Sequence, residues 1–329
     1  MKILFVHKGL STFVASDLKI LQKRYKVKDV SVKNRFINIP MAFLDVARSD
    51  LIFAWFASWH SLFYILFPKL LRKYSIVVAG GYDVANMPEI DYGLIRRGIK
   101  KIIGKSILRL SDAVLCFSQF SKEEASRNAG VSEEKVHLVY LGVESENVEK
   151  DLIKENMVIT VGNINFSNLK RKGMESFVYA AGFIPDIPFV LIGKWEDKAI
   201  DYLKSVASPN VVFPGFIPAD ELRKYMQRAK VYVQVSAHEG FGLALAEAML
   251  YECIPVVTKI GALPEIVGDV GLYTSSADPK VVAEKIGTAL TLENDLGKKA
   301  RERIVQRFPL KRREEEIFRF INNLMRLQI

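Results

Sequence analysis

Residues 236–249 read SAHEGFGLALAEAM, and residues 231–235 directly before them read VYVQV. The apolar run predicts a buried strand, and the small and apolar residues from Leu243 onward predict a helix. Between them lies a short turn with two glycines and the carboxylate of Glu239, and seven residues separate this glutamate from Glu247. A strand–turn–helix corner of this kind can bind a phosphate on free helix amides and sugar hydroxyls on its carboxylates.

The same alternation of strand and helix runs along the whole chain in two series. In the first series, strands are predicted at residues 3–7, 25–30, 51–56, 76–79, 113–117 and 136–140. In the second, strands are predicted at 157–161, 189–192, 211–213, 231–235, 254–258 and 271–273, and helices at 173–183, 196–206, 219–228, 243–251, 279–292, 298–307 and 310–327. Parallel strands need crossover helices between them, so this order predicts an α/β fold of two Rossmann-like, doubly wound domains.

The division into domains follows from length and composition. A chain of 329 residues is long for one hydrophobic core, and residues 141–156 (LGVESENVEKDLIKEN) have the charged, core-poor character of a linker. We therefore expect an N-terminal domain at 1–145, a linker at 146–156, a second domain at 157–308 and a C-terminal helix at 309–329. Ligands of doubly wound sheets bind at the carboxyl ends of the strands, so we expect the site in a cleft between the two sets of strand ends.

The basic charge of the chain is concentrated in its first half. The whole chain carries a formal net charge of +10. Residues 1–150 contain 23 Lys and Arg against 15 Asp and Glu, a net of +8, and residues 151–329 contain 24 against 22, a net of +2. This asymmetry predicts an anionic partner for the first half. The two cysteines, Cys116 and Cys253, lie in apolar runs without metal-ligand spacing, so we interpret them as buried side chains in a reducing compartment.

Residues 51–67 (LIFAWFASWHSLFYILF) form the most apolar segment of the chain. Their length lies at the short limit for a membrane span, and His60 and two serines interrupt the run. We favour a buried strand followed by an apolar helix at 59–73, with a spanning helix as the alternative. The first residues, MKILFV, lack the basic and apolar regions of a signal peptide and are read as the first strand.

Residues 162–173 (GNINFSNLKRKG) connect a predicted strand to a predicted helix. Three consecutive cations, Lys170, Arg171 and Lys172, are expected at the N-terminus of that helix. Positive side chains beside free backbone amides form an anion site, so we favour phosphate binding here. A solvated basic loop is the alternative.

Glu247 stands in a helix whose other residues are nearly all small or apolar. A carboxylate in that setting is costly without a partner, and the two hydroxyls of a ribose would supply one. Gly240 and Gly242 bracket Phe241, which suits a backbone that approaches a ligand closely. The alternative is an ordinary turn and an amphipathic helix with one exposed glutamate.

These motifs resemble the signature of retaining GT-B glycosyltransferases of family 4, also called glycosyl transferases group 1. The resemblance rests on EGFGL at 239–243 with Glu247, on IPVV at 254–257 and on GALPEIV at 261–267. Segments 139–144 (VYLGVE) and 213–216 (FPGF) fall in the family's order, so the resemblance covers essentially the whole chain. It implies a GT-B fold whose C-terminal helix returns to the N-terminal domain.

The resemblance also implies roles for individual residues. Glu239 would hold the hydroxyls of the donor sugar, Glu247 would bind the ribose, and Lys172 would neutralise the leaving diphosphate. The remaining donor contacts implied are the backbone amides of Phe241, Gly242 and Leu243 at the distal phosphate, Gly162, Asn163 and Arg171 near the diphosphate, and Gly193, Lys194, Phe216 and Ile217 at the base. The implied reaction retains the sugar's configuration, and it requires no metal and no cofactor.

The sequence departs from the family pattern at two places. Many relatives have an arginine where Asn163 stands, and Lys170 or Arg171 is the candidate to compensate. Relatives often carry a histidine in the N-terminal loop at 80–83, which here reads GGYD. Asp83 is our candidate for a catalytic contact there, and a turn cap is the equal alternative. Lys8 and Gly9, after the first strand, are expected to approach the diphosphate.

Residues 96–109 hold basic side chains and no acidic one. Isoleucines recur at helical spacing among them, which predicts a basic amphipathic helix. It is interpreted as a helix packed on its sheet, as a membrane-surface element or, less favoured, as a nucleic-acid site. The residues expected at a membrane or acceptor are Arg96, Arg97, Lys100, Lys101 and Lys105.

The predicted function is transfer of a sugar from a UDP- or GDP-linked donor to a glycan or lipid-linked acceptor. We expect the protein in the cytoplasm, peripheral on the inner face of the cell membrane, with no nucleic-acid partner. Two alternatives remain: a nucleotide-sugar-binding accessory protein without transferase activity, and a nucleotide-sugar epimerase or phosphorylase.

Overall fold

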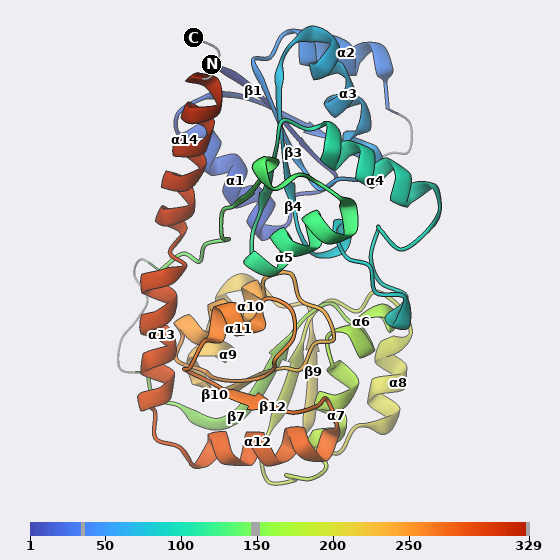
Figure 1. The fold of residues 1–329 in the computed structure, drawn as a ribbon. Coiled ribbons are helices and arrows are strands. Elements are labelled where there is room, and N and C mark those ends of the chain that lie inside the picture. The colour runs from blue at the N-terminus through green and yellow to red at the C-terminus, as the bar shows by residue number, and fades with distance from the viewer. Residues whose placement is uncertain (34–36, 146–151, 327–329) are drawn as a thin grey trace. The chain divides into compact units, whose positions relative to one another are not determined.

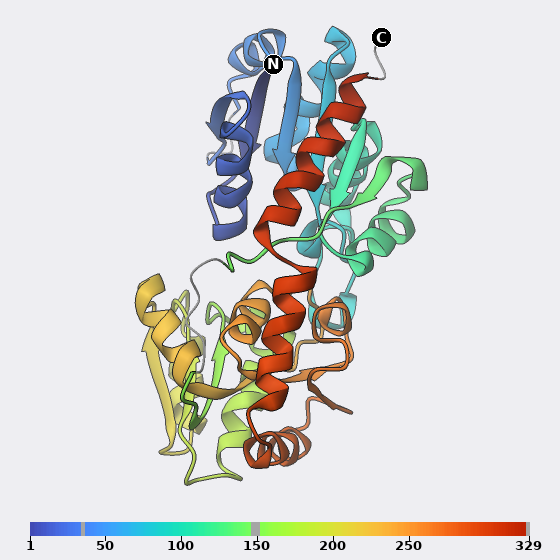
Figure 2. The same ribbon diagram turned by 90° about the vertical axis from the view of Figure 1, so that its left-hand side faces the viewer.

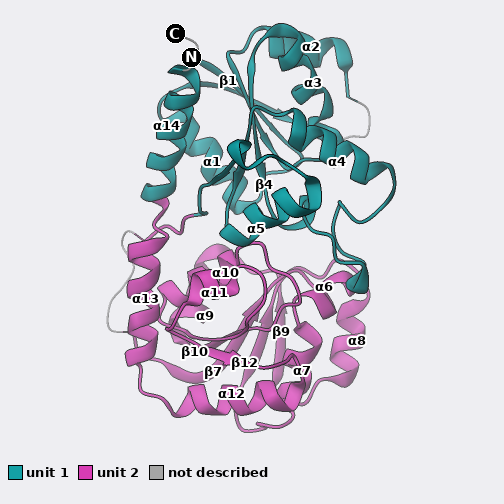
Figure 3. Ribbon diagram, viewed as in Figure 1, with its two compact units in different colours: residues 1–141, 311–329 teal, residues 142–310 magenta. Residues whose placement is uncertain are grey.

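The computed structural model describes residues 1–33, 37–145 and 152–326. The chain forms two compact units (Figure 3): unit 1 comprises Met1–Leu141 and Lys311–Ile329, and unit 2 comprises Gly142–Leu310. Residues 146–151 of the expected linker lie outside the described residues. The first strand of unit 2 begins at Glu155, two residues earlier than predicted.

Unit 1 is built on a six-stranded parallel sheet with the order β2-β1-β3-β4-β5-β6. Its strands are β1 (Lys2–His7), β2 (Lys26–Ser31), β3 (Leu51–Trp55), β4 (Tyr74–Ala79), β5 (Ala113–Cys116) and β6 (Val136–Leu138). Its helices include α1 (Thr12–Gln22), α2 (Ile39–Ala47), α3 (Leu62–Leu71), α4 (Gly98–Leu110), α5 (Gln119–Glu124) and α14 (Leu310–Arg326) (Figure 1). Strand order reverses between β1 and β3, so the carboxyl ends of these two strands mark the position where such sheets bind ligands.

The apolar segment 51–67 divides as a strand and a helix. All five residues of β3 are buried, as expected for an inner strand of a parallel sheet covered on both faces. A short 3-10 turn, Trp59–Ser61, then leads into α3. Within the described residues, we find no helix that is both long and apolar enough to cross a membrane. The spanning-helix alternative for this segment is therefore wrong.

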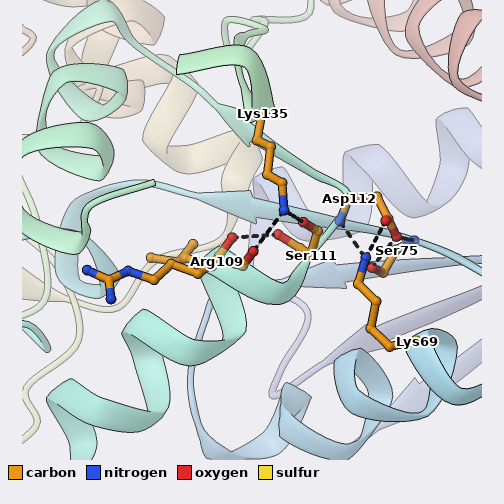
Figure 4. Close-up of polar contacts among 7 residues, drawn as sticks. Lys69, Ser75, Arg109, Ser111, Asp112 and Lys135 are labelled. Atoms are coloured by element: carbon orange, nitrogen blue, oxygen red, sulfur yellow. Dashed lines mark hydrogen bonds and ion pairs between the residues drawn. The ribbon is translucent and has the colours of Figure 1, made fainter. Parts of the chain in front are cut away.

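Polar contacts join the end of α4 to the neighbouring strands and to α3 (Figure 4). The Lys135 ammonium donates to the carbonyls of Arg109 and Ser111, at 2.9 and 3.2 Å. A cation satisfies carbonyl groups that have no partner within the helix. Asp112 accepts from the backbone and hydroxyl of Ser75 at 2.9 and 2.8 Å and pairs with Lys69. These contacts link the end of α4 and the start of β5 to β4, β6 and α3.

The C-terminal helix α14 packs in unit 1, as expected for the fold (Figure 2). Arg313 donates to both carboxylate oxygens of Asp17 at 2.6 and 2.7 Å, and both side chains are buried. The same guanidinium also donates to the carbonyls of Val139 and Tyr140. A buried charge needs this number of partners, so Arg313 fixes α14 against α1 and the end of unit 1's first segment.

Unit 2 repeats the architecture with the strand order β12-β11-β10-β7-β8-β9. Its strands are β7 (Glu155–Val161), β8 (Phe189–Ile192), β9 (Val211–Gly215), β10 (Ala229–Gln234), β11 (Ile254–Thr258) and β12 (Leu272–Thr274). Its helices are α6 (Phe166–Arg171), α7 (Met174–Ala181), α8 (Ala199–Val206), α9 (Ala219–Arg228), α10 (Leu243–Leu250), α11 (Leu263–Val267), α12 (Pro279–Thr291) and α13 (Asp295–Arg307). Strand order reverses between β7 and β10, the two strands whose following loops were predicted to bind phosphate and sugar.

Three short helices differ from the prediction. Two of them, α6 and α11, of six and five residues, were not predicted at all, and for the third, the six-residue α5, a helix or a loop was expected after the strand at 113–117. Helical periodicity becomes visible only over longer windows, and these segments carry loop-like residues such as serine, asparagine and proline. The position of α6 changes the interpretation of the phosphate loop, as described below.

Candidate functional site

The candidate site of unit 2 lies where the carboxyl ends of β7 and β10 are neighbours. β7 leads into the loop that begins at Gly162, and β10 leads into residues 235–242. Parallel pairing of β7 with β10 brings these two loops to the same edge of the sheet. Crossover helices leave in opposite directions from such a point, which opens a crevice above the two strands.

An ion pair joins the two loops. The Lys172 ammonium lies 3.1 Å from Oε2 of Glu239, and the amide of Gln234 donates to the same oxygen at 2.5 Å. The Glu239 side chain is only 13% exposed. Burial by itself raises the pKa of Glu239, but the nearby charges of Lys172 and Arg171 outweigh burial and hold the pKa below its ordinary value. Glu239 is therefore an ionised, oriented acceptor with one oxygen engaged by two donors.

The backbone of Glu239 is fixed by the loop after β11. Its carbonyl accepts from the amide of Ala262 at 2.9 Å. Gly261 has φ 63°, and a Cβ at this position would lie 2.4 Å from the Glu239 carbonyl oxygen. The close approach therefore requires glycine at 261. The start of the motif at 261–267 therefore supports the backbone of Glu239.

The turn after Glu239 presents the N-terminus of α10. Gly242 precedes the helix with φ 92°, in the left-handed region that favours glycine. Phe241 is buried, and its ring packs edge-on against Phe308 at 5.7 Å between centroids. Because the Phe241 side chain points into the core, the turn offers its backbone to the crevice. Leu243 begins α10, whose first amides have no carbonyl partner within the helix and form an anion-binding end.

Glu247 lies in the second turn of α10, among buried Leu245, Ala246 and Ala248. Burial raises the pKa of Glu247 to about 7. Within the described residues we find no hydrogen bond or ion pair to its carboxylate. A buried carboxyl group without a hydrogen-bond partner is stabilised by a ligand that donates hydrogen bonds to it. The hydroxyls of a ribose are donors of this kind.

The three cations of the loop 162–173 directly precede the N-terminus of α7, whose N-cap is Gly173, as predicted. They also end a helix that was not predicted. Lys170 and Arg171 form the last turn of the unpredicted helix α6, and Lys172 caps its C-terminus. They also diverge. Lys172 pairs with Glu239, whereas the Arg171 guanidinium donates to Oδ1 of Asn168 at 2.6 Å. Arg171 is nonetheless near enough to Glu239 to lower its pKa, so it adds positive charge to this corner.

Asn163 points to a different partner. Its amide donates to Glu196 at 2.8 Å, and Asn165 donates to the other carboxylate oxygen of Glu196 at 2.5 Å. These contacts tie the loop after β7 to the loop after β8. Asn163 is neutral and engaged with Glu196, so Arg171, whose charge lowers the pKa of Glu239, is the candidate for the second cation of the corner.

Glycines at the carboxyl ends of β7, β8 and β9 allow the backbones of these strands to approach one another closely. The amide of Gly193 donates to the Gly215 carbonyl at 3.0 Å. A Cβ on Gly193 would lie 2.0 Å from the Gly162 carbonyl oxygen, so no larger residue fits there. Ile164 donates to the carbonyl of Lys194 at 2.8 Å. The three strand ends thus form a smooth backbone platform beside the corner.

Two aromatic side chains stand at that platform. Trp195 is exposed and lies over Gly215, where a Cβ would be 3.6 Å from the indole ring. The Lys204 ammonium lies 4.2 Å from the centroid of a Trp195 ring. Phe216 is 78% exposed, and Ile217 beside it is partly buried. Exposed aromatic rings at a strand's carboxyl end are suited to stacking on a nucleobase.

In unit 1, the predicted donor residues Lys8 and Gly9 follow β1 and are exposed. Phe56, directly after the neighbouring strand β3, has φ 68°, a strained conformation for a bulky residue that is common at functional sites. His60 is buried behind this turn and contacts the Trp55 carbonyl at 2.9 Å. Burial, reinforced by the charges of Lys8 and His7, lowers the pKa of His60 to about 4, so its ring is neutral at pH 7.

Asp83 is buried and holds two loops together. Its carboxylate accepts from the amide of Gly80 at 2.9 Å and from the amide of Ala57 at 3.0 Å. Burial raises its pKa to about 7, although these backbone hydrogen bonds act in the opposite direction. Both oxygens are used within the protein, which supports the turn-cap alternative over a direct substrate contact.

The basic helix begins at Gly98, so Arg96 and Arg97 lie before α4 rather than within it. Arg96 pairs with Asp91, and the Arg109 guanidinium donates to the Ala129 carbonyl at 2.8 Å. In the part of the chain that the structure describes, Lys100, Lys101 and Lys105 have no ion pair. Two of the isoleucines expected to pack are instead exposed: Ile99 by 72% and Ile102 by 66%.

Several contributors to the site were missed in the sequence. Gln234 is the polar residue at the end of the apolar strand VYVQV, and its position directly before the loop was the available signal. Asn168, buried in α6, and the exposed Glu196 orient the loop after β7, but isolated polar residues of this kind give no comparable signal in the sequence. Their roles depend on which loops become neighbours, which the linear sequence does not contain.

Comparison with known families gives one match that bears on this geometry. A family model described as glycosyl transferases group 1 matches residues 143–307. The O-antigen chain mannosyltransferase B of Escherichia coli is 24% identical over 194 residues, which cover 53% of this chain and 50% of that protein. An alpha-maltose-1-phosphate synthase of Mycolicibacterium smegmatis is 24% identical over 217 residues, covering 58% and 51%. The chain thus spans about half the length of the curated relatives it matches.

Solved structures resemble nearly the whole chain. HepE of Anabaena, crystallised with UDP and glucose, has a TM-score of 0.79 at 17% identity and covers 98% of this chain and 99% of its own. Sucrose-phosphate synthase of Thermosynechococcus elongatus has a TM-score of 0.76 at 17% identity, covering 99% and 100%. At these identities the likeness shows the fold alone, and the expected GT-B class of α/β fold is confirmed.

Proposed function

The chain belongs to the glycosyl transferases group 1 family, and from that membership we propose that it transfers a sugar from a nucleotide diphosphate sugar to an acceptor hydroxyl. The observation that carries the proposal is the ion pair of Lys172 with Glu239 at the reversal point of the unit 2 sheet. It sets a cation, a carboxylate and the N-terminus of α10 around one corner. Relatives named as mannosyltransferases and a neighbour solved with UDP support a nucleotide-linked donor.

In this proposal the residues divide the donor among them. Glu239 accepts hydrogen bonds from sugar hydroxyls through the oxygen that Lys172 and Gln234 leave available. Lys172, Arg171 and the first amides of α10 hold the diphosphate. Glu247 binds the ribose hydroxyls, and the base stacks beside Trp195 and Phe216. The carboxylate–lysine pair supports this division because Lys172 can transfer its charge from Glu239 to an incoming phosphate.

The chemistry follows from charge. The bond between the sugar's anomeric carbon and the diphosphate oxygen breaks, and a bond from that carbon to the acceptor oxygen forms. Negative charge develops on the leaving diphosphate, where Lys172 and the α10 amides stabilise it. The acceptor proton passes to a phosphate oxygen. We propose retention of configuration and no metal requirement, so chelation by EDTA is expected to leave the rate unchanged.

The acceptor side of the proposal involves unit 1 and an anionic membrane surface. Ile99 and Ile102 are exposed on α4 beside the exposed Lys100 and the half-buried Lys101, and α4 packs against the apolar helix α3. Leu70 of α3 is exposed as well. Burial, followed by the like charges of Lys101 and Arg109, lowers the pKa of Lys105, which an anionic surface would counteract. Exposed isoleucines among lysines suit the headgroup region and support a lipid-linked acceptor.

A donor screen tests the function. The purified protein is heated with UDP, GDP and their hexose conjugates, and the matching donor is expected to raise the melting temperature by mass action. Product analysis then separates the alternatives: release of nucleotide diphosphate with a glycosylated acceptor supports transfer, and epimerised sugar supports an epimerase. Binding without turnover of any acceptor supports an accessory protein. If none of these nucleotides changes the melting temperature, the proposal is wrong.

A further inference from the structure

A second pocket opens in unit 2 on the other side of β10 from the Lys172–Glu239 corner. It has a volume of about 560 Å³ and lies at the carboxyl ends of β10, β11 and β12. The residues that matter for its chemistry are Lys170 from α6, Ser236 after β10, Thr258 and Lys259 at the end of β11, and the run 273–277 at the end of β12. None of the residues given a role under the proposed function lines it, whereas Lys170, which the sequence offered as one of two candidates to compensate for Asn163, does.

The lining is cationic and rich in hydroxyls. Two lysines, Lys170 and Lys259, line the pocket, and its lining includes no aspartate or glutamate. In the described ranges neither lysine forms an ion pair. Lysine acts as a point charge on phosphate, and serine and threonine hydroxyls add hydrogen bonds to its oxygens. An uncompensated pair of cations therefore favours an anionic ligand.

The pocket walls are held by buried hydrogen bonds. The Thr258 hydroxyl donates to the Ser236 carbonyl at 2.9 Å, which ties the loop after β11 to the loop after β10. The Thr274 hydroxyl donates to the Ser276 carbonyl at 2.6 Å and shapes the loop after β12. Both threonines are buried. The three loops thus form a preorganised wall.

Lys170 and Lys172 are close in sequence but belong to different sites. Lys172 is engaged by Glu239, whereas Lys170, two residues earlier in α6, lines the second pocket. Val235, Ile260 and Tyr273 add an apolar surface, and the volume suits a ligand larger than phosphate alone. We propose that this pocket binds the phosphate group of a phosphate ester, with a phosphorylated sugar as the class of ligand that fits its size. This site is independent of the proposed donor function.

Site-resolved lysine footprinting tests the proposal. The full chain is acetylated with and without inorganic phosphate or glucose 6-phosphate, and each lysine's rate is read by mass spectrometry. Lys170 and Lys259 are expected to be protected at least threefold, while Lys280 and Lys285 of α12, which do not line the pocket, keep their rates. Protection by phosphate alone identifies free phosphate as a sufficient ligand, and protection by glucose 6-phosphate alone identifies the ester. No protection of these two lysines by either compound at 10 mM overturns the proposal.

A variant pair completes the test. Lys170→Gln with Lys259→Gln is expected to weaken binding of the protecting compound at least tenfold in calorimetry, and Lys280→Gln with Lys285→Gln to leave it unchanged. Lys170, Lys259 and Lys280 are exposed and Lys285 is half-buried, so the unliganded melting temperatures are expected to agree within a few degrees. Unchanged binding in the first variant contradicts the proposal. The footprint is measured without nucleotide, so its result does not depend on whether the donor corner binds a nucleotide sugar.

Discussion

The ammonium of Lys172 lies 3.1 Å from the carboxylate of Glu239, across 67 residues of sequence. The pair connects the loops after β7 and β10, where the strand order of unit 2 reverses. In a partly buried setting each charge stabilises the other. A diphosphate that enters this corner competes with Glu239 for the lysine and leaves the carboxylate available for sugar hydroxyls. The ion pair is therefore a preorganised form of the proposed donor site.

Removing the cation tests this relationship. Lys172→Ala is expected to lower kcat by roughly a hundredfold to a thousandfold, since one preorganised charge at a developing anion contributes about that much. Lys172→Arg keeps the charge and is expected to recover part of the rate. Steady-state kinetics with saturating donor measures both. Lys280→Ala, at an exposed lysine of α12, serves as the control. Equal activity of Lys172→Ala and this control would contradict the role of Lys172.

Glu247 gives a prediction for pH. Burial raises its pKa from 4.5 to about 7, so folding favours its protonated form. Below pH 4.5 both the folded and unfolded states are protonated and the group contributes nothing. As pH rises from 4.5 to 7 the unfolded state releases the proton first, so the free energy of unfolding falls, and it levels off above 7. At about 1.4 kcal/mol per pKa unit, the loss is at most roughly 3 kcal/mol.

The variant Glu247→Gln removes this effect. It is expected to be more stable than the parent protein at pH 8 and equally stable at pH 4, as measured by urea unfolding. Its affinity for the nucleotide is expected to fall at least tenfold, because the amide replaces an acceptor of two ribose hydroxyls. Gain of stability with loss of binding is typical of a ligand site. A loss of stability at pH 8 would refute the burial argument.

Much of the fold was predictable from the sequence, for identifiable physical reasons. Strands such as Ile254–Thr258 and Phe189–Ile192 are continuous apolar runs between turn residues, so their bounds were predicted correctly. The short helix α6 was not predicted, because its six residues include Ser167 and Asn168 and show no apolar period. As a result, Lys170 and Arg171 were predicted in a loop, whereas they form the last turn of this helix.

The site was predictable where residue type alone carries the chemistry. Glu239, Lys172 and the glycines at 240 and 242 were selected for their charge or backbone freedom. The partners that orient them were not, because Gln234, Gly261 and Asn168 act through contacts between loops. Ile99 and Ile102 show the opposite error: their spacing indicated packing, yet both are exposed. Periodicity defines a helical face but not which face meets the sheet.

Trp195 supplies a direct optical signal for the base. The other two tryptophans, Trp55 and Trp59, lie in unit 1. Stacking of a base on Trp195 is expected to quench fluorescence, and Trp195→Phe is expected to abolish the change. Trp195→Ala is expected to weaken nucleotide binding by about 1–3 kcal/mol, the usual contribution of one stacked base. Phe183→Ala, another exposed aromatic of unit 2, is the control. Quenching that survives Trp195→Phe would place the base elsewhere.

The membrane proposal is tested by charge reversal. Lys100→Glu with Lys101→Glu is expected to reduce binding to phosphatidylserine vesicles at least tenfold, because each basic residue near an anionic surface contributes about 1 kcal/mol. Lys280→Glu with Lys285→Glu in unit 2 is the matched reversal. Vesicle co-sedimentation at low and high salt measures both. Equal sedimentation of the parent protein and of the Lys100→Glu, Lys101→Glu variant would exclude this surface as the membrane contact.

Two neighbouring arginines of α14 test the packing of unit 1. Arg313 forms a buried ion pair with Asp17, whereas Arg312 pairs with Glu316 on the surface. Arg313→Met is expected to lower the free energy of unfolding by about 3–5 kcal/mol, since it leaves a buried carboxylate without its partner. Arg312→Met is expected to cost less than about 1 kcal/mol. Chemical unfolding of the two variants measures the difference, and equal losses would contradict the burial assigned to Arg313.

The central claim is that the corner at Glu239 orients a donor sugar for transfer. The most direct measurement compares sugar transfer and nucleotide diphosphate affinity in Glu239→Gln and the parent protein. The account predicts a loss of transfer of at least a thousandfold with affinity for the nucleotide diphosphate equal to or above that of the parent protein, because Glu239 contacts the sugar and its neutralisation removes the carboxylate that competes for Lys172. Transfer near the parent rate in Glu239→Gln would contradict the account.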